Sequence, residues 1–257
     1  EAGVVLGDPR WLDAAGAAAE LVVSLHLVDG RLRRASRDDV VGSAGGVLED
    51  YGCLAEGLLV LHAATGNPRW LEVATGLLDT ALDHFAGDVP GAFHDTADDA
   101  DALVWRPSDI GDNASPSGSS AIAGALLLGA ALAGPDRADR YRSAAESAVA
   151  RAGLLAARVP RFAGHWLSVA EALIRGPLQV ALVGAPDDPR TEELRAAAIT
   201  AAPGGSVVVI GPPHTSGVPL LADRPLVDGA PAAYVCRGYV CDRPVTSAAE
   251  LTAALAR

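Results

Sequence analysis

Apolar positions recur at helical spacing along the first two thirds of the chain, and the stretches that carry them begin with a repeated sequence motif. GDPRWLDAA at 7–15 returns as GNPRWLEVA at 66–74, and a fainter copy, DRYRSAA, lies at 139–145. In the full copies, Asp or Asn followed by Pro is typical of a helix start. Recurrence of this kind predicts repeated helical units. The apolar stripes are Trp11, Ala15, Ala18 and Val22 in the first copy, and Trp70, Ala74, Leu77, Ala81 and Phe85 in the second.

A second kind of helix precedes the second and third copies. LLVLHAATG ends at Gly66 and LLLGAALAG ends at Gly134, and both are apolar on nearly all sides, which indicates burial. The unit is therefore a buried helix, a tight turn, a half-buried helix and a long loop. We expect a mainly α fold in which residues 1–177 form a partial (α/α)6 toroid of helical hairpins. Cys53 falls in a predicted buried helix and is expected to be inert.

The start of the chain aligns with the end of such a buried helix. EAGVVLG at 1–7 occupies the register that is held at 60–66 by the last turns of the helix before the second copy. We therefore expect the chain to begin within a helix and to be a fragment of a longer protein.

The pattern changes at about residue 178. LQVALVG and SVVVIG are short β-branched runs separated by the helical stretch TEELRAAAITAA, an order that predicts a βαβ unit. AAYVCRGYVC predicts a strand or a tight hairpin, and SAAELTAALAR a closing helix. Residues 178–257 are thus expected to form a small α/β subdomain. No GxGxxG joins strand to helix, so dinucleotide binding is not supported and no cofactor is predicted.

Charge narrows the choice of function. The 257 residues carry a net charge of −12, and every basic residue is Arg. This balance argues against nucleic-acid and membrane-surface partners, and the lack of Lys excludes Schiff-base chemistry and a Walker A loop. The apolar core of the longest uncharged run is too short to span a bilayer. Without an apolar leader pattern, a cytoplasmic setting is the default expectation.

Chemistry is expected at the end of the array where the buried helices begin. If buried and outer helices alternate, LEDYG at 48–52 and DNASPSGSS at 112–120 lie on one rim, where free helix N–H groups also point. Capping alone would also select such residues, and the Ser-rich stretch is not the G-x-S-x-G of a Ser hydrolase. The rim candidates are Glu49, Asp50, Tyr51, Asp112, Asn113, Ser115, Ser117 and Ser119.

The loop at 91–109, GAFHDTADDADALVWRPSD, adds to this rim. It pairs two predicted extended pieces, AFHDT and LVWRP, around acidic residues. Trp105 offers a stacking face for a sugar ring and Arg106 an orienting cation, and paired carboxylates could act as acid and base. A solvated acidic loop is the alternative, a Ca²⁺ site fits the spacing poorly, and His94 as a base lacks an assigned partner. The acidic residues are Asp95, Asp98, Asp99 and Asp101.

Two cysteines flank RGYV in the predicted hairpin. Cys236 and Cys241 could lie opposite each other on paired strands. Packing is the first interpretation, redox or metal roles are the others, and a disulfide would be unusual in a cytosolic protein. A zinc site would need two more ligands, and the His residues show no metal-ligand spacing, so no metal is predicted.

Three long stretches carry a family resemblance. LEDYGCLAEGLLVLHAATGNPRWLE, GAFHDTADDADALVWRPSDIGDNASPSGSS and AAYVCRGYVCDRPV resemble, in this order, the C-terminal half of the thioredoxin-domain-containing proteins related to spermatogenesis-associated protein 20. The resemblance implies a toroid of the six-hairpin glycosidase and N-acylglucosamine 2-epimerase type. It also implies an N-terminal thioredoxin-like domain in the full-length protein.

Two hypotheses of different classes follow. In the first, the toroid binds or transforms a saccharide-like small molecule. Asp50 and Asp112 are then the acid–base carboxylates, and the ligand is held by Glu49, Tyr51, Trp105, Arg106, Asn113 and Ser117. In the second, the toroid is a noncatalytic scaffold that holds a protein or peptide for an attached thioredoxin-like domain, and Asp50 and Asp112 are helix caps.

Overall fold

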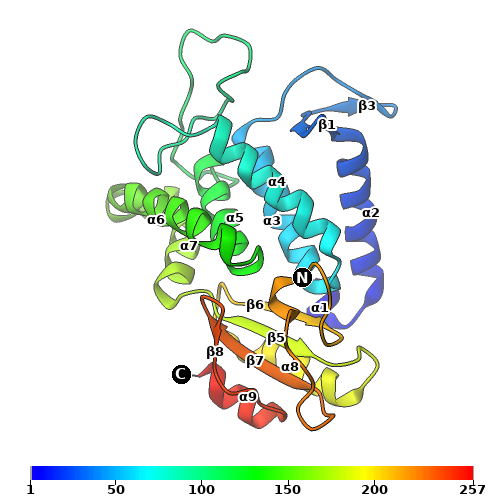
Figure 1. The fold of residues 1–257 in the computed structure, drawn as a ribbon. Helices are drawn as coiled ribbons and strands as arrows, with labels where there is room; N and C mark the ends of the chain where they lie inside the picture. The colour runs from blue at the N-terminus through cyan, green and yellow to red at the C-terminus, as the bar shows by residue number, and fades with distance from the viewer. Residues whose placement is uncertain (1, 257) are drawn as a thin grey trace.

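The computed structural model describes residues 2–256, and its larger part is an array of helical hairpins (Figure 1). The two helices of a hairpin are joined by a short turn at one end, and long loops at the other end lead from the first hairpin to the second and from the second to the third. This arrangement confirms a mainly α chain built from hairpins. The helices are α1 (Ala2–Leu6), α2 (Pro9–His26), α3 (Leu48–Thr65), α4 (Pro68–His84), α5 (Gly118–Leu132), α6 (Pro135–Arg158) and α7 (Gly164–Arg175), with a 3-10 turn, η1 (Pro160–Phe162), before α7.

The repeated nonapeptide is a helix-start signal. Asp8 accepts a hydrogen bond from the Arg10 N–H at 3.0 Å, and Asn67 accepts one from the Arg69 N–H at the same distance. Gly66 ends α3 with a φ of 66°, a backbone conformation that residues with a Cβ rarely adopt. Cap and turn chemistry together explain why the same letters occur twice.

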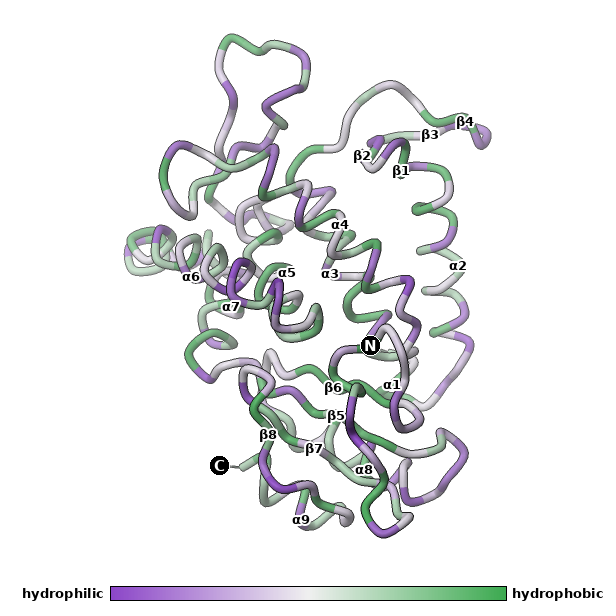
Figure 2. The backbone as a smooth tube through the Cα atoms, in the orientation of Figure 1, coloured by the Kyte–Doolittle hydropathy of each residue, from purple (hydrophilic) through white to green (hydrophobic). Residues whose placement is uncertain are grey.

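Burial of the outer helices follows the predicted stripe in the second copy but not in the first. Trp70 and Tyr141 are buried, and the green and purple stretches of α4 and α6 in Figure 2 mark their amphipathic faces. Trp11 is 56% exposed, and Val23 is the residue of α2 that is buried. The prediction of a buried stripe in α2 was wrong because this helix lies at the edge of the array (Figure 1) and has few neighbours.

The central helices α3 and α5 lie backbone to backbone. At Gly52, an added Cβ would lie 2.7 Å from the Ile122 N atom, and at Gly118 it would lie 3.0 Å from the Glu49 N atom. Small residues at these positions therefore set the separation of the two helix N-termini. None of the helices within residues 2–256 is long and apolar enough to cross a lipid bilayer.

The prediction that Cys53 is buried was wrong. Its side chain is exposed and lines a hollow together with Trp11 and Ala15 of α2. Partial desolvation, with the charges of Glu49, Glu56 and Asp50, raises the pKa of this thiol. A raised pKa disfavours the nucleophilic thiolate.

The C-terminal part is a sheet covered on both faces. The strand order is β6-β5-β7-β8. Strands β5 and β6 are parallel and are connected through α8, which confirms the βαβ unit. The pairs β5–β7 and β7–β8 are antiparallel, and the second of them confirms the predicted hairpin. One face packs under α8 and α9, and the other contacts the helical array and shares its core. The elements are β5 (Gln179–Val183), α8 (Pro189–Ala201), β6 (Val207–Gly211), η2 (Pro219–Leu221), β7 (Ala232–Arg237), β8 (Val240–Cys241) and α9 (Ala248–Leu255).

Two small hairpins between α2 and α3 were not predicted. They are β1 (Leu27–Val28) with β2 (Arg31–Leu32), and β3 (Ser36–Arg37) with β4 (Val40–Val41). The first turns at Asp29 and Gly30, both with positive φ, a dipeptide typical of two-residue hairpin turns.

The predicted extended pieces at 92–96 and 103–107 do not form a pair of strands. Within the described residues they are linked by one backbone hydrogen bond, from the Asp95 N–H to the Pro107 carbonyl at 2.8 Å, and by the side chain of Arg106. The loop is therefore held at its base by a few polar contacts and not by a ladder.

Candidate functional site

A hollow of about 220 Å³ lies where α3 and α5 begin, and we call it the acidic hollow. It contains three of the residues predicted for the site, Glu49, Asn113 and Ser117, together with two carboxylates from the preceding loop, Asp95 and Asp109. The predicted common rim of the two helix N-termini is therefore formed. The acidic hollow is smaller than the roughly 300–1,000 Å³ typical of drug-sized ligands, so it suits a ligand of about one ring.

Backbone contacts position the carboxylates of the acidic hollow. The Leu48 N–H, at the start of α3, donates to the Asp95 carbonyl at 2.9 Å, which fixes the loop beside Glu49. The Asp109 N–H donates to Asp95 Oδ2 at 3.1 Å, and the Gly111 N–H donates to Asp109 Oδ1 at 2.9 Å. Asp95 and Asp109 are thus held by main-chain donors, which is the rigidity that a binding site requires.

Asp95 is the carboxyl group of the acidic hollow best suited to carry a proton. Burial raises its pKa above the ordinary value, and the charges of Asp109 and Glu49 add to this effect. The hydrogen bond from the Asp109 N–H and the charge of His94 oppose the shift without cancelling it. Asp95 was named in the acidic cluster of the loop, but neither Asp95 nor Asp109 was among the residues predicted to hold the ligand. The signal available was their position at the two ends of the loop at 91–109.

Asp112 is buried beside the acidic hollow and does not line it. Its carboxylate accepts hydrogen bonds from the Ser120 hydroxyl at 2.6 Å and from the backbone N–H groups of Ser117, His165 and Trp166 at 3.0, 2.9 and 3.3 Å. Burial alone would raise the pKa of Asp112, but these four donors outweigh it and hold the pKa below the ordinary value. This ionised group joins the N-termini of α5 and α7.

Asp50 and Ser117 also make capping interactions. Asp50 Oδ2 accepts from the Val47 N–H at 2.9 Å and lies 3.5 Å from Arg34 Nε. Ser117 Oγ accepts from the Ser120 N–H at 3.2 Å, as expected of a residue that precedes a helix. The structure thus places Ser117 at the acidic hollow, but it gives Asp50 a partner on its own helix start.

The three remaining predicted residues lie apart from the acidic hollow. Tyr51 is buried with its ring 5.0 Å from that of Phe85, and its hydroxyl accepts from the Leu32 N–H at 3.0 Å. Arg106 donates to the carbonyls of Thr96 and His84. Trp105 is 73% exposed in the loop. Tyr51 therefore supports β2, Arg106 supports the loop, and Trp105 faces solvent.

One group of side chains within residues 2–256 has the spacing of a cation site. His84, Asp98 and Asp99 place ligand atoms within 4.8 Å of one another, at the base of the loop. Asp99 already forms a two-point ion pair with Arg31 at 2.6 and 2.7 Å, and His84 Nδ1 lies 2.9 Å from Asp98. Because Asp98 and Asp99 already have partners in His84 and Arg31, these groups form a polar clasp between β2 and the loop.

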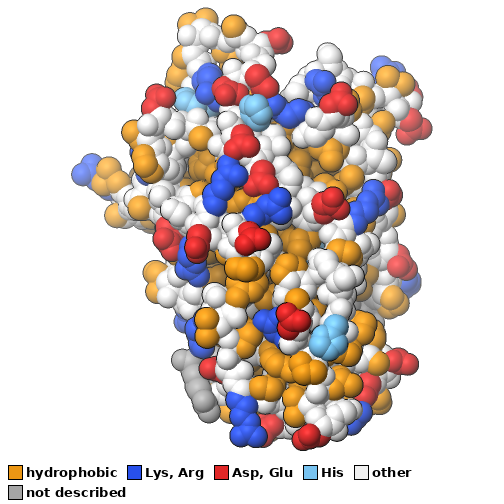
Figure 3. Space-filling view, in the orientation of Figure 1, with side chains coloured by type: hydrophobic (Ala, Val, Ile, Leu, Met, Phe, Trp, Pro, Cys, Tyr) orange, Lys and Arg blue, Asp and Glu red, His pale blue; other side chains and the backbone are white. Residues whose placement is uncertain are grey.

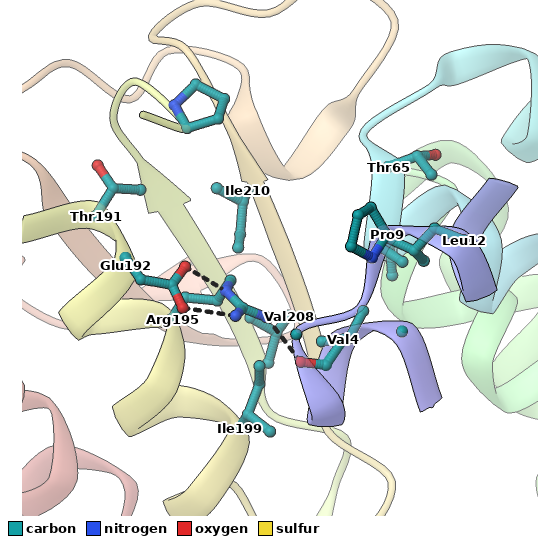
Figure 4. A pocket seen from close by; sticks show the side chains of 15 residues that line it. Val4, Pro9, Leu12, Thr65, Thr191, Glu192, Arg195, Ile199, Val208 and Ile210 are labelled. Carbon is teal, nitrogen blue, oxygen red and sulfur yellow. Dashed lines mark hydrogen bonds and ion pairs between the residues drawn. The ribbon is translucent and has the colours of Figure 1, made fainter. Parts of the chain in front are cut away.

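A larger hollow of about 560 Å³ lies between the N-terminal helices and the sheet (Figure 4). Its walls are mainly apolar, and its charged side chains are already paired: Arg195 contacts Glu192 at 2.6 Å and donates to the Val4 carbonyl at 3.0 Å. The hydroxyl of Thr191 points away from the hollow in Figure 4. No polar group there converges on a central point, so this hollow gives a ligand little to recognise.

The charged surface shows no basic stripe on the face seen in Figure 3, where Arg side chains lie among acidic ones. Arg137 and Arg140, for example, reach Asp79 on the neighbouring α4 at 3.3 Å each. The acidic excess is therefore not offset by a local cationic patch on this face.

Comparison with known proteins shows a partial similarity. No known protein-family profile matches the chain. Human spermatogenesis-associated protein 20 is 33% identical over 136 residues, which cover 49% of this chain. The matched segment covers 17% of the length of the human protein. The chain is thus a distant relative of that protein.

Proposed function

We propose that this chain binds a saccharide-like small molecule in the acidic hollow, as part of an α/α toroid. The observation that carries the proposal is the convergence of Glu49, Asp95 and Asp109 with Asn113 at the N-termini of α3 and α5. Carboxylate and amide oxygens accept hydrogen bonds from sugar hydroxyls, and the size of the hollow suits one ring. A toroid, an attached thioredoxin-like domain and a cytoplasmic setting remain parts of this interpretation.

In this proposal, Asp95 takes the role of proton carrier, for which Asp50 and Asp112 were first considered. Its raised pKa is the property that a general acid or a donor to a ligand oxygen requires. Asp112, with four donors and a lowered pKa, is poorly suited to carry a proton and acts as a positioning residue for α5. Asp50 fixes the start of α3 beside Glu49.

The first prediction concerns Asp95→Asn. In a panel of aldohexoses and N-acetylhexosamines observed by saturation-transfer NMR, we expect at least one sugar to bind the full chain. The substitution is expected to weaken that binding roughly tenfold, or about 1.4 kcal/mol, because it replaces a carboxyl that can accept or donate with a fixed amide. Binding by the unsubstituted chain should change with pH above the ordinary Asp range near 4, and this dependence should disappear in the variant.

Asp88→Asn is the matched control, since Asp88 is an exposed carboxylate near the same loop that does not line the acidic hollow. It should leave binding unchanged. Equal losses in both variants, or no sugar bound at millimolar concentration, would refute the saccharide proposal.

A second function, protein binding, is favoured by a different observation. Leu103, Val104 and Trp105 are consecutive apolar residues with exposures of 52, 104 and 73%. Exposed apolar clusters of this kind are typical of docking sites, and tryptophan is common among residues that dominate binding energy. This function corresponds to the scaffold hypothesis.

The second prediction tests residues 103–105, which we call the apolar tip. On an array of immobilised peptides, Trp105→Ala is expected to lower binding to apolar peptides by about tenfold or more, as at an interface hot spot. Trp11→Ala is the control, because Trp11 is also exposed, at 56%, but lies on α2. If the two variants bind alike, the tip is not a docking site.

A further inference from the structure

The hairpin of β7 and β8 carries a disulfide at its base. Cys236 and Cys241 are register partners and are bonded to each other. Between the strands, Gly238 and Tyr239 both adopt positive φ, of 55° and 66°, which is the pattern of a two-residue turn. The first interpretation of this pair, packing as two thiols, was wrong: the tight turn brings the two side chains into bonding contact.

A guanidinium group points at this disulfide. Nη2 of Arg224 lies 3.1 Å from Cys241 Sγ and 3.6 Å from Cys236 Sγ, and Nη1 donates to the Ala222 carbonyl at 3.1 Å. No carboxylate forms an ion pair with Arg224 in the part of the chain that the structure describes. Burial lowers the pKa of Arg224, and the nearby Tyr234, Tyr239 and Asp223 oppose this shift without cancelling it. A disulfide sulfur is neutral and a weak hydrogen-bond acceptor. The charged Arg224 guanidinium, a strong donor, therefore faces a poor acceptor in the disulfide state.

We infer that Cys236 and Cys241 form a redox-active pair that exchanges with an external dithiol, and that Arg224 stabilises the thiolates released on reduction. A thiolate beside a fixed guanidinium has a depressed pKa and is a better leaving group. The Arg224 guanidinium, which forms no ion pair with a carboxylate of the described residues in the disulfide state, gains an anionic partner in the reduced state.

The exposure of the two cysteines sets the order of events. Cys236 is 1% exposed, whereas Cys241 is partly exposed and is the sulfur that an external thiolate can reach. Attack forms a bond to Cys241 Sγ and breaks the S–S bond, and the electron pair leaves on Cys236 Sγ beside Arg224. The second thiolate of the external dithiol then attacks its own sulfur in the mixed disulfide and releases Cys241. The external dithiol becomes a disulfide and supplies the two electrons and two protons of the reduced pair.

The hairpin has anchors other than its disulfide, so it can remain folded after reduction. The Tyr239 N–H donates to Gln179 Oε1 at 2.8 Å, and the Tyr239 hydroxyl accepts from the Gly134 N–H at 2.6 Å. Gln179 in turn donates to the Ala131 carbonyl at 2.7 Å. These bonds hold the turn against the α5–α6 hairpin. The pair can therefore cycle between its two states without unfolding of the sheet.

The third prediction tests this pair in the full chain with Cys53→Ser, which removes the other thiol. The chain is equilibrated with defined ratios of reduced and oxidised glutathione, thiols are trapped by alkylation, and the reduced fraction is read by mass spectrometry. Arg224→Gln is expected to shift the equilibrium roughly tenfold towards the disulfide, since one pKa unit of thiolate stabilisation is a factor of ten. Arg224→Lys, which keeps the charge, should restore most of the effect.

The pH dependence of alkylation gives a second readout that a structural disulfide would not produce. In the reduced protein with Arg224 intact, the alkylation rate should titrate below the ordinary thiol pKa of about 8.5, and Arg224→Gln should return it to that value. Titration at or above 8.5 with Arg224 intact overturns the inference even if the Gln variant fails to fold. A disulfide that excess dithiothreitol reduces only after urea unfolding also overturns it.

Discussion

Asp112→Asn is expected to destabilise the folded chain by about 3 kcal/mol, because one buried carboxylate satisfies four donors at the meeting point of two helices. The asparagine side chain has one acceptor oxygen, and its NH₂ group would face the backbone N–H donors that now contact the second oxygen. Hydrogen bonds to ionised groups contribute about 1.5–3 kcal/mol each, and buried donors left without an acceptor add their own cost.

The measurement is urea unfolding of both proteins at neutral pH. Asp139→Asn is the control, since Asp139 is an exposed carboxylate on α6 and should change stability by no more than about 0.5 kcal/mol. If Asp112→Asn behaves like this control, the carboxylate is not a structural junction. In the saccharide proposal, Asp112 would then again be a candidate for the acid–base residue.

The same pair of proteins gives a pH signature. The pKa of Asp112 is lower in the folded chain than in the unfolded chain, so the unfolded state binds the proton first as pH falls. The stabilisation by this carboxylate is present above the unfolded value of about 3.9 and is lost as pH falls through the folded pKa. The stability difference between the unsubstituted chain and Asp112→Asn should therefore shrink in acid below about pH 4.

Local signals predicted the hairpins well because they act within a few residues. The caps at Asp8 and Asn67 and the turn at Gly66 each satisfy a backbone requirement that is independent of the rest of the fold. The dipeptide Asp29–Gly30 is an equally local turn signal, although no turn was predicted there. The exposure of Trp11 could not be predicted in this way, since Trp11 and the buried Trp70 share the tetrapeptide PRWL and differ in how many helices surround them.

The common rim of α3 and α5 was predicted, but the contacts of its side chains were not. That the starts of α3 and α5 share a rim follows from alternating helices, and Glu49, Asn113 and Ser117 do line one hollow. Which carboxylate is solvated, capped or proton-carrying depends on contacts distant in sequence, such as that of Asp112 with the backbone of α7. The disulfide partner of Cys236 was within reach of register arguments, but the approach of Arg224 from another loop was not.

Gly52→Ala is expected to cost about 2–3 kcal/mol, although alanine is the better helix former. An added Cβ would lie 2.7 Å from the Ile122 N atom and 2.8 Å from the Ala121 carbonyl carbon, and both are backbone atoms that cannot turn aside. Relief requires α3 and α5 to separate, which loosens a well-packed contact along both helices. The gain of about 1 kcal/mol in helix propensity offsets only part of this cost.

Gly57→Ala provides the matched comparison, because Gly57 lies on the same helix and a Cβ there would meet nothing within 4 Å. It is expected to leave stability unchanged or to raise it by up to about 1 kcal/mol, again measured by urea unfolding. Separation of the helices by Gly52→Ala should also move Glu49 away from Asn113 and weaken any sugar binding in the acidic hollow. Equal stability of the two variants would mean that α3 and α5 are not in backbone contact. The common rim of the two helix N-termini, on which the proposed site depends, would then be wrong as well.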